Sequence, residues 1–246
     1  MSWASLSAWR DLPRTNEAEK IDDPAQPFPE IERSMRDVAL SNRLFGGTQT
    51  VLYHVAKILR NVPKDTEVRI LDIATGSGDI PLALAEWGRK EGRQLTIIAL
   101  DNHAAMLRMA QAAAPKIPLV QANALALPFA PGSFDIALCA LAFHHFGYEM
   151  SIQVLKAMDR LTTRGFVVTD LRRDLPTLWG IKAVFAALQA HAFTRHDAPT
   201  SVRRAFTPSE YRKMVGQSGV QNVRLRIHCY FRVALVQDKS KLDRQS

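Results

Sequence analysis

The sequence contains little cysteine: Cys139 and Cys229 are the only two among its 246 residues, and both lie in apolar, strand-like runs. A disulfide scaffold and a zinc site built from cysteines are therefore excluded, and a reducing cytoplasm is the expected location. No run approaches the ~18 consecutive apolar residues that a membrane span requires. Residues 1–15 contain tryptophan and charge but no apolar core, so we expect no secretory signal.

Internal repeats and low-complexity tracts are also absent, and the composition is that of an ordinary globular protein. Apolar residues make up 47% and charged residues 23% of the chain, so a core of normal size can form. A length of 246 residues fits one domain with an extension.

Acidic residues are scarce in the C-terminal third. The net charge of the chain is +8. Residues 1–159 hold 16 basic and 18 acidic side chains, a net charge of −2, whereas residues 160–246 hold 16 basic and 6 acidic side chains, a net charge of +10. A basic surface of this kind can bind nucleic acid, anionic lipid or an acidic substrate. It can equally be a solvated arginine-rich face, because the charges are spread through apolar patterning rather than gathered in one basic run.

Proline and periodicity divide the chain into four segments. Residues 1–29 are predicted to be loosely structured, because three prolines fall within six residues and helix and strand interiors tolerate proline poorly. Residues 30–62 form a predicted helical cap, in which apolar residues recur at helical spacing on both sides of Gly46-Gly47. Residues 63–238 form the main predicted domain, and residues 239–246 a tail.

Short apolar runs alternate with helical stretches in the main domain. Each run is almost continuously apolar, as strands covered on both faces must be. The alternation predicts βαβ units with right-handed crossovers. The expected fold class is therefore α/β, a doubly wound, Rossmann-like sheet that is mainly parallel and ends in an antiparallel strand pair. Predicted strands cover 68–74, 95–100, 117–122, 134–141 and 166–171, with two more within 220–238; predicted helices cover 80–90, 103–114, 149–161 and about 176–194, and after a polar loop at 194–204 a further helix opens at Thr207.

The first strand of the main domain runs into a turn of small residues and then a helix. Asp72 ends the strand, Gly76 and Gly78 lie in the turn, and the helix begins near Ile80. Glycine lets the backbone approach a ligand, and a new helix offers free N–H groups. Ligands of such sheets bind beyond the carboxyl ends of the strands. The same turn also occurs in proteins that bind nothing there, in which case Asp72 would only cap the helix.

The ligand that this turn favours is a cation rather than a dinucleotide. A dinucleotide fingerprint requires a third glycine where this chain has Pro81, and the carboxylate of Asp72 would repel a pyrophosphate. A phosphate-binding loop is excluded because no Gly-Lys-Ser/Thr follows the glycines. An acid before the turn suits a ligand with ammonium and sulfonium groups. Asp101, at the end of the second strand, is placed to accept both hydroxyls of a ribose.

Three motifs in this order resemble those of the class I S-adenosylmethionine-dependent methyltransferases: Asp-x-Ala-x-Gly-x-Gly at 72–78, Asp101, and Asn123-Ala124-Leu125. The resemblance covers residues 67–238, and the Phe-His-His-Phe run and the helix start at Thr207 belong to it. The glycine turn is most similar to that of the quinone-ring C-methyltransferases of ubiquinone and menaquinone synthesis. S-adenosylmethionine is therefore the implied cofactor and S-adenosylhomocysteine the implied product.

The resemblance implies a role for each matching residue. Asp72 and the backbone of the turn would hold the methionine portion of the cofactor, and Asp101 the ribose. Asn123 stands where many relatives have an aspartate, so the hydrogen-bonding shape is kept without the charge. No metal is expected, because no spacing suggests a metal site. The predicted cofactor residues are Asp72, Ala74, Thr75, Gly76, Ser77, Gly78, Asp101, Asn102, Met106, Asn123, Ala124, Leu125 and Ala140.

Two adjacent histidines, His144 and His145, follow the fourth strand with a phenylalanine on each side. By resemblance they lie over the methyl group of the cofactor, where an imidazole can position and deprotonate a flat acceptor. His145 is the preferred base. Alternatively, one histidine caps the next helix and the other bonds to the backbone. His196, beside Asp197, is a further candidate base.

Arginines near the same sheet edge are candidates for binding a carboxylate or phosphate of the acceptor. A guanidinium holds such a group through two parallel hydrogen bonds. The same arginines would also be compatible with a solvated rim. The apolar helix at 176–194 is predicted either as core or as a lid over a hydrophobic acceptor. The predicted substrate-binding residues are Arg172, Arg173, Arg195 and Arg203.

The predicted function is methyl transfer to oxygen or carbon of a small acceptor of aromatic, phenolic, quinone-like or polyketide type. Methylation of adenine or of cytosine C5 is disfavoured, because residues 139–146 lack the motifs of those enzymes. Two alternatives stay open: an RNA methyltransferase that binds phosphates through the basic C-terminal portion, and a non-catalytic cofactor-binding subunit of the same fold. The oligomeric state is left open.

Overall fold

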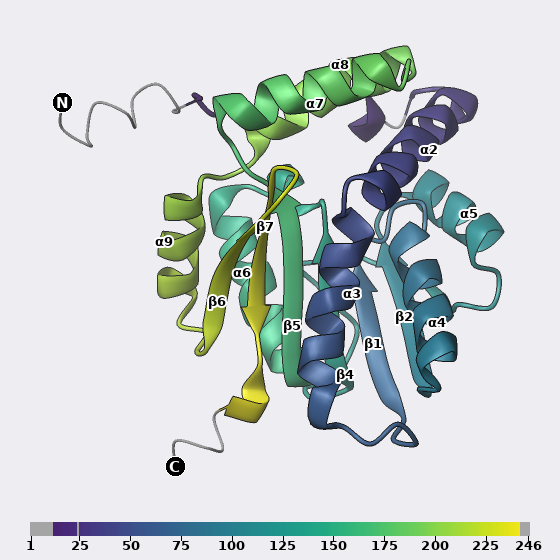
Figure 1. Ribbon diagram of the computed structural model, residues 1–246, viewed down its shortest axis with the longest axis vertical. Coiled ribbons are helices and arrows are strands. Elements are labelled where there is room, and N and C mark those ends of the chain that lie inside the picture. Colours follow the sequence, from purple (N-terminus) through teal and green to yellow (C-terminus); the bar gives the residue numbers. More distant parts are fainter. Residues whose placement is uncertain (1–11, 24, 242–246) are drawn as a thin grey trace.

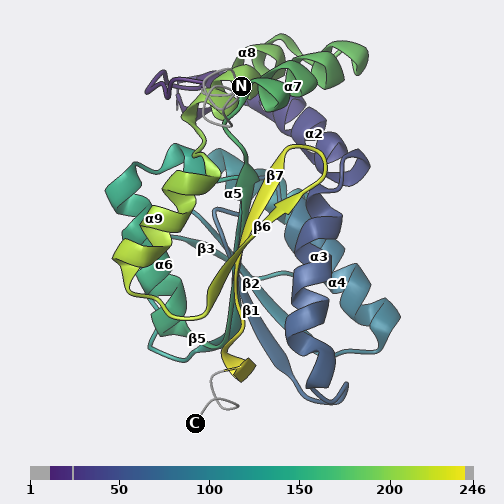
Figure 2. The ribbon, with the colours of Figure 1, turned by 60° about the vertical axis from the view of Figure 1, so that its left-hand side comes forward.

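The computed structural model describes residues 12–23 and 25–241 (Figure 1). Predictions that concern residues 1–11, Pro24 and residues 242–246 lie outside the described residues. Within the described part, a twisted sheet carries helices on both faces and a third group of helices across one end (Figure 2).

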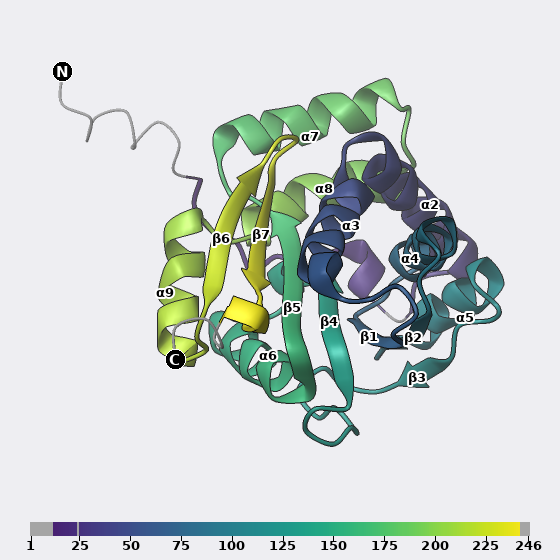
Figure 3. The same ribbon diagram turned by 60° about the horizontal axis from the view of Figure 1, so that its bottom comes forward.

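The sheet has seven strands in the order β3-β2-β1-β4-β5-β7-β6, which fan across the molecule in Figure 3. The first five are parallel, and β7 runs antiparallel to both β5 and β6. The predicted fold class is thus confirmed. The strands are β1 (Val68–Ile73), β2 (Leu95–Asp101), β3 (Leu119–Gln121), β4 (Phe134–Ala140), β5 (Thr162–Leu171), β6 (Val223–His228) and β7 (Arg232–Gln237).

Both faces of the sheet are buried, which explains the continuous apolar runs. On one face α3 (Gly47–Ile58) and α4 (Asp79–Glu91) enclose a core around Ile70 and Ile136. On the other, α6 (Tyr148–Leu161) and α9 (Pro208–Ser218) enclose a core around Phe143 and Phe166. The short helix α5 (Ala104–Ala113) packs against β2 and β3. None of the described helices is long and apolar enough to cross a membrane.

Three helices lie across the carboxyl ends of the parallel strands, at the top of Figure 1: α2 (Phe28–Leu44), α7 (Leu175–Ala187) and α8 (Ala192–Arg204). The predicted helical cap therefore divides between two places. Its first helix, α2, packs on α8 at this end, whereas its second, α3, packs on the face of the sheet against β5 and β7.

The polar loop predicted at 194–204 is wrong, because these residues form α8 in spite of Pro199. The buried face of α8 is itself polar, with Thr194, Asp197 and Ser201 all buried. Their side chains bond to other segments: the hydroxyl of Thr194 donates to Asp37 on α2 at 2.8 Å. Such a helix lacks the apolar periodicity that sequence reasoning detects, and its tertiary contacts compensate for the hydrogen bond that proline removes.

Residues 12–23, which we call the N-terminal strap, contain one turn of 3-10 helix, η1 (Lys20–Asp22). The strap is held on α8 by hydrogen bonds. The backbone N–H groups of Lys20 and Ile21 donate to the two carboxylate oxygens of Asp197, at 2.9 and 3.0 Å. Although this part of the predicted loose segment has little regular structure, it lies in a defined place over the ends of the strands.

The two cysteines lie in different environments. Cys139 is buried in β4, as its apolar surroundings predict. Cys229 is exposed in the turn between β6 and β7, outside the strand that the sequence predicts for it.

Candidate functional site

A cavity of about 500 Å³ lies beyond the carboxyl ends of β1, β2, β4 and β5, enclosed by α2, α7, α8 and the N-terminal strap. Its volume falls within the roughly 300–1,000 Å³ typical of small-molecule sites. The glycine turn after β1 lines one half, which we call the cofactor half. Two histidines after β4, together with α7, α8 and the strap, line the other, which we call the acceptor half.

The turn after β1 brings backbone close to the cavity and to α5. Ala74, Gly76 and Gly78 all have positive φ, at 56°, 56° and 78°. A Cβ on Gly78 would lie 3.0 Å from the Cα of Ala110 on α5, so only glycine fits there without a shift. A second non-glycine residue with positive φ, Leu141, follows β4 and also lines the cavity. Strained backbone of this kind concentrates at functional sites.

Asp101 joins the end of β2 to the glycine turn. One carboxylate oxygen accepts a hydrogen bond from the backbone N–H of Gly76 and the other from that of His103, each at 2.9 Å. A carboxylate oxygen can accept more than one hydrogen bond. Asp101 lines the cavity, so both oxygens can still accept from a ligand diol.

Asp72 is fully buried, and burial raises its pKa to about 7, with further contributions from the negative charges of Asp79 and Asp101. Burial also raises the pKa of Asp79, whose carboxylate accepts a hydrogen bond from the side-chain amide of Asn42 at 3.0 Å. Three carboxylates gathered in one half of a cavity favour a cationic ligand there.

The structure places ten of the predicted cofactor residues on the cavity wall and three off it. Ser77 and Gly78 belong to the turn but do not line the cavity, and Leu125 is exposed. The backbone N–H of Leu125 donates to the side-chain oxygen of Asn123 at 2.9 Å, so that oxygen is used within its own turn. The wall residues are Asp72, Ala74, Thr75, Gly76, Asp101, Asn102, Met106, Asn123, Ala124 and Ala140.

The cofactor half contains a buried donor that fits a polar ligand. The Nδ1 atom of His103 accepts from the backbone N–H of Ala105 at 3.2 Å, so its proton is on Nε2. This Nε2 is buried and has no hydrogen-bond partner among the described residues. Together with the carboxylates of Asp72 and Asp101, this N–H is a donor and acceptor set suited to a ligand with both cationic and hydroxyl groups.

In the acceptor half, His144 and His145 form a turn of 3-10 helix, η3 (Phe143–His145), directly after β4. The backbone N–H of His144 bonds to one oxygen of Asp170 at 2.8 Å, and its Nδ1 lies 2.7 Å from the other. Burial alone would raise the pKa of Asp170, but the charge and hydrogen bonds of His144 outweigh it and lower that pKa. The Nδ1 of His145 lies 3.1 Å from Asp22 of the strap.

Glu19, on the strap, faces both histidines and was not predicted. Its carboxylate oxygens lie 3.7 Å from the Nε2 of His144 and 3.9 Å from that of His145. Burial raises the pKa of Glu19 to about 7, although the hydroxyl of Ser201 donates to one oxygen at 2.8 Å. No sequence signal could reveal this contact, because the strap has no periodicity and lies more than a hundred residues before η3.

Two arginines that were not predicted line the cavity, Arg204 and Arg232. Arg204 lies 2.7 Å from Asp22 and 3.5 Å from Glu19. Burial lowers the pKa of Arg232 to about 10. One of its amino groups donates to Asn42 at 2.9 Å, which ties β7 to α2.

The four predicted substrate-binding arginines and His196 lie outside the cavity wall. Arg173 is buried and used internally: it pairs with Glu210 at 2.6 Å and donates to the carbonyls of Leu12 and Ala205. Arg172 pairs with Asp174. The Nδ1 atom of His196 lies 2.8 Å from Asp197, but the ring is partly exposed and does not line the cavity. Arg195 and Arg203 are also on α8 and do not reach the cavity.

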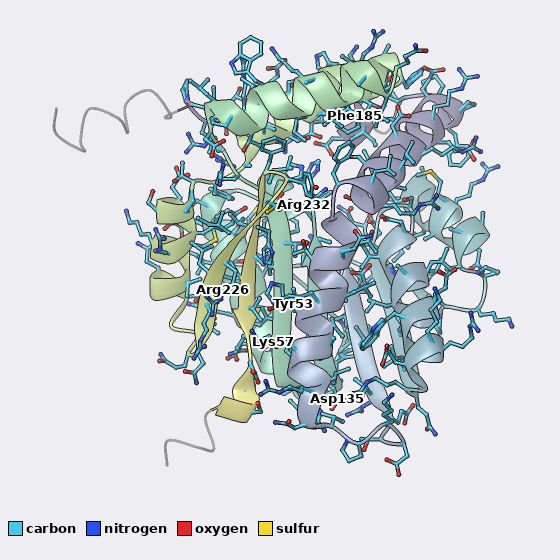
Figure 4. All side chains as sticks on the ribbon, viewed as in Figure 1. Tyr53, Lys57, Asp135, Phe185, Arg226 and Arg232 are labelled. Atoms are coloured by element: carbon cyan, nitrogen blue, oxygen red, sulfur yellow. The ribbon has the colours of Figure 1, made fainter. Side chains whose placement is uncertain are left out.

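Part of the wall of the acceptor half is apolar, beside the polar residues that α8 contributes. Leu171 ends β5, and Ile181 and Phe185 project from α7. Figure 4 shows Phe185 and Arg232 at the end of the sheet that α7 covers, and Asp135 at the opposite end. On α7 the residues that line the cavity are buried, whereas Trp179 is 64% exposed. The helix therefore lines the cavity with residues that also pack as core.

Comparison with known proteins agrees with this geometry. Residues 70–165 match a family model described as "Methyltransferase domain". A demethylmenaquinone methyltransferase of Thermus thermophilus is 38% identical over 99 residues, which are 38% of this chain and 41% of that protein. A ubiquinone/menaquinone biosynthesis C-methyltransferase of Rhizobium leguminosarum is 28% identical over 179 residues, 66% of this chain and 68% of the relative.

The fold has a counterpart among solved structures. A SAM-dependent methyltransferase from Aquifex aeolicus superposes with a TM-score of 0.59 at 15% identity, over 87% of this chain and 97% of the other. The matches to several demethylmenaquinone methyltransferases span about half the length of those proteins, between 41% and 55%.

Proposed function

We propose that this chain, which carries a class I S-adenosylmethionine-dependent methyltransferase domain, methylates oxygen or carbon of a small quinone-like, phenolic or polyketide acceptor. One observation carries the proposal: a single cavity is lined both by the carboxylate-rich glycine turn and by the two histidines under α7 and α8. Relatives named for demethylmenaquinone and for ubiquinone/menaquinone synthesis support a flat, apolar acceptor.

The cofactor half suits S-adenosylmethionine, which supplies the activated methyl group when it is bound. Asp72 would face its positive charges, and Asp101 would accept from its ribose hydroxyls while holding the glycine turn in place. The buried N–H of His103 and the guanidinium of Arg232 are donors on the same wall. In such a reaction the protein contributes mainly the positions of the two reactants.

The acceptor half has the means to bind and activate a flat molecule. Ile181, Phe185 and Leu171 provide apolar surface and exclude water. A phenol or carbon acid must also lose a proton before it accepts a methyl group. We assign this activation to the cluster of Glu19, His144 and His145, whose polar atoms converge on one point of the cavity.

The experiment incubates the protein with methyl-labelled S-adenosylmethionine and a small-molecule extract of its host, with host RNA in a parallel tube. We expect label in the organic-soluble fraction, and mass spectrometry then identifies the acceptor. An Asp101→Asn variant is the control for label that does not depend on cofactor binding. Label in RNA alone would favour the basic C-terminal surface as a binding site, and no label in either tube would favour a non-catalytic subunit.

A further inference from the structure

The three groups that face the acceptor half also have the chemistry of a metal site. A ring nitrogen of His144, one of His145 and a carboxylate oxygen of Glu19 all lie within 4.8 Å of one another. Two histidines with one carboxylate are a frequent set of protein ligands for catalytic zinc and related ions. No sequence pattern predicts this metal site, because Glu19 joins the histidines only through the tertiary structure.

The distances between these atoms suit a small tetrahedral ion. Oε1 of Glu19 lies 3.7 Å from Nε2 of His144, and Oε2 of the same carboxylate lies 3.9 Å from Nε2 of His145. An ion with bonds of about 2.1 Å holds tetrahedral ligands roughly 3.4 Å apart. The three ligand atoms lie within 4.8 Å of one another, so the side chains would move closer together as the ion binds.

Both imidazoles are oriented as metal ligands usually are. A ligating histidine commonly donates its other ring N–H to a carboxylate, which fixes its tautomer and direction. His144 has its Nδ1 2.7 Å from the buried Asp170, and His145 has its Nδ1 3.1 Å from Asp22. With both Nδ1 atoms bound in this way, both Nε2 atoms face Glu19, and a metal ion would bind the lone pair that a neutral ring has there.

Charge and burial at the cluster are consistent with a divalent cation. Glu19, Asp22 and Asp170 contribute three carboxylates, against the one guanidinium of Arg204, which leaves two negative charges when the imidazoles are neutral. Glu19 is only 4% exposed, and its Oε1 has no hydrogen-bond partner in the part of the chain that the structure describes. The guanidinium of Arg204 lies 3.5 Å from this oxygen without a hydrogen bond to it, so the burial of the oxygen is only partly compensated.

We propose that Glu19, His144 and His145 bind a divalent transition-metal ion of the Zn²⁺ class, with an open position toward the acceptor half. Two nitrogen ligands favour such ions over Mg²⁺ and Ca²⁺, which prefer oxygen. This inference deepens the proposed function, because the open position would take the oxygen of the acceptor and lower the pKa of its hydroxyl. Arg204 would keep its contact with Asp22, at 2.7 Å, and release Glu19.

The test is to strip the full-length protein with a chelator and titrate it with Zn²⁺ in a calorimeter and with Co²⁺ in a spectrophotometer. We expect one equivalent to bind and Co²⁺ to show the strong visible bands of a tetrahedral site. Glu19→Gln, which keeps the shape of the side chain, and His145→Ala should each weaken binding at least 100-fold. Asp22→Asn should weaken it by about ten-fold or more, as loss of an outer partner does.

A matched control disrupts a second pair of neighbouring histidines, His54 and His228, by replacing one of them. His54 and His228 have their Nε2 atoms 2.8 Å apart near the surface and could otherwise bind Zn²⁺ on their own. The His228→Ala variant should therefore retain the site and its Co²⁺ spectrum. If Zn²⁺ binds equally well to the wild type and to Glu19→Gln, or does not bind to the wild type, the metal site is refuted.

Separate readouts distinguish this inference from the proposed function. S-adenosylhomocysteine affinity, measured on the same variants, verifies that the fold and the cofactor half are intact. Methyl transfer by stripped protein at an undiminished rate would refute the role of the metal and leave the proposed function standing. Metal binding without any methyl transfer would support the site and refute the proposed function.

Discussion

The two halves of the cavity are built in different ways. In the cofactor half, Asp72, the glycine turn and Asp101 come from adjacent strand ends, and hydrogen bonds from Thr75 to Leu100 and from Gly76 to Asp101 join them. In the acceptor half, Glu19 of the strap contacts Ser201 of α8, which lies 182 positions further along the sequence. His144 and His145, which contact Glu19 as well, come from a third segment, η3. A site made of neighbouring strand ends can be recognised from motifs, whereas one assembled from distant segments cannot.

The largest expected effect is a loss of cofactor affinity when Asp101 in the cofactor half is replaced. In Asp101→Asn, an amide N–H group must replace one oxygen that now accepts from Gly76 or His103. Loss of one or two charge-assisted hydrogen bonds, each about 1.5–3 kcal/mol, should weaken S-adenosylhomocysteine binding about 100-fold in calorimetry. Asp135→Asn, at the opposite end of the sheet (Figure 4), should bind normally. Equal affinities in the two variants would contradict the role of Asp101.

The next largest effect is on stability, and it compares two glycines to separate the cost of backbone conformation from the cost of close packing. Gly78 and Gly92 both have positive φ, but a methyl group added at Gly78 would meet the backbone of Ala110 at 3.0 Å, whereas one added at Gly92 would have no described neighbour within 4 Å. Gly92→Ala should lower the free energy of unfolding by about 1 kcal/mol, and Gly78→Ala by about 2–3 kcal/mol. Urea denaturation measures both. Similar losses in the two variants would show that α5 yields to the added methyl group.

A pH titration tests the charge of the cofactor half. The pKa of Asp72 is about 7 without a ligand because of burial and the nearby Asp79 and Asp101. Below pH 7 the carboxyl takes up a proton, and the neutral acid no longer attracts a cation. Affinity for S-adenosylmethionine should thus fall about tenfold per pH unit below 7 and level off above 8. Asp72→Asn should bind weakly with a flat profile; a sloping profile in that variant would assign the titration to another group.

The smallest effect should be confined to the acceptor half. Phe185→Leu removes part of the apolar wall, so KM for the acceptor should rise several-fold, since burial of this much apolar surface contributes on the order of 1 kcal/mol. The affinity for S-adenosylhomocysteine should stay within twofold. Trp179→Leu is the matched control, because it changes an aromatic residue of the same helix that is 64% exposed. A change of KM in the control, or of cofactor affinity in Phe185→Leu, would mean that α7 does not act on the acceptor half separately.

Several elements could be predicted because their signals are local. Buried parallel strands read as continuous apolar runs, and the order of strand, glycine turn and helix at 68–91 identifies the cofactor half. The capping box of α9, with Thr207 and Glu210, is equally local and is present in the structure. His144 and His145 could be placed in the cavity because they directly follow β4.

Other elements could not be predicted because their side chains bond to distant partners. The polar residues of α8 bury themselves against the strap and α2, so its sequence resembles a loop. Arg173 has the sequence context of a substrate-binding arginine, yet its donors serve Glu210 and two carbonyls inside the protein.

The sequence by itself determined the sheet and the cofactor half, because strand burial and the glycine turn depend on residues a few positions apart. Only the tertiary structure decided the acceptor half: it placed Glu19 against His144 and His145, moved the predicted arginines off the wall and put Arg204 on it. The physical reason is that a buried polar group must find a partner wherever the fold brings one, and its own neighbours in sequence do not reveal which partner that is.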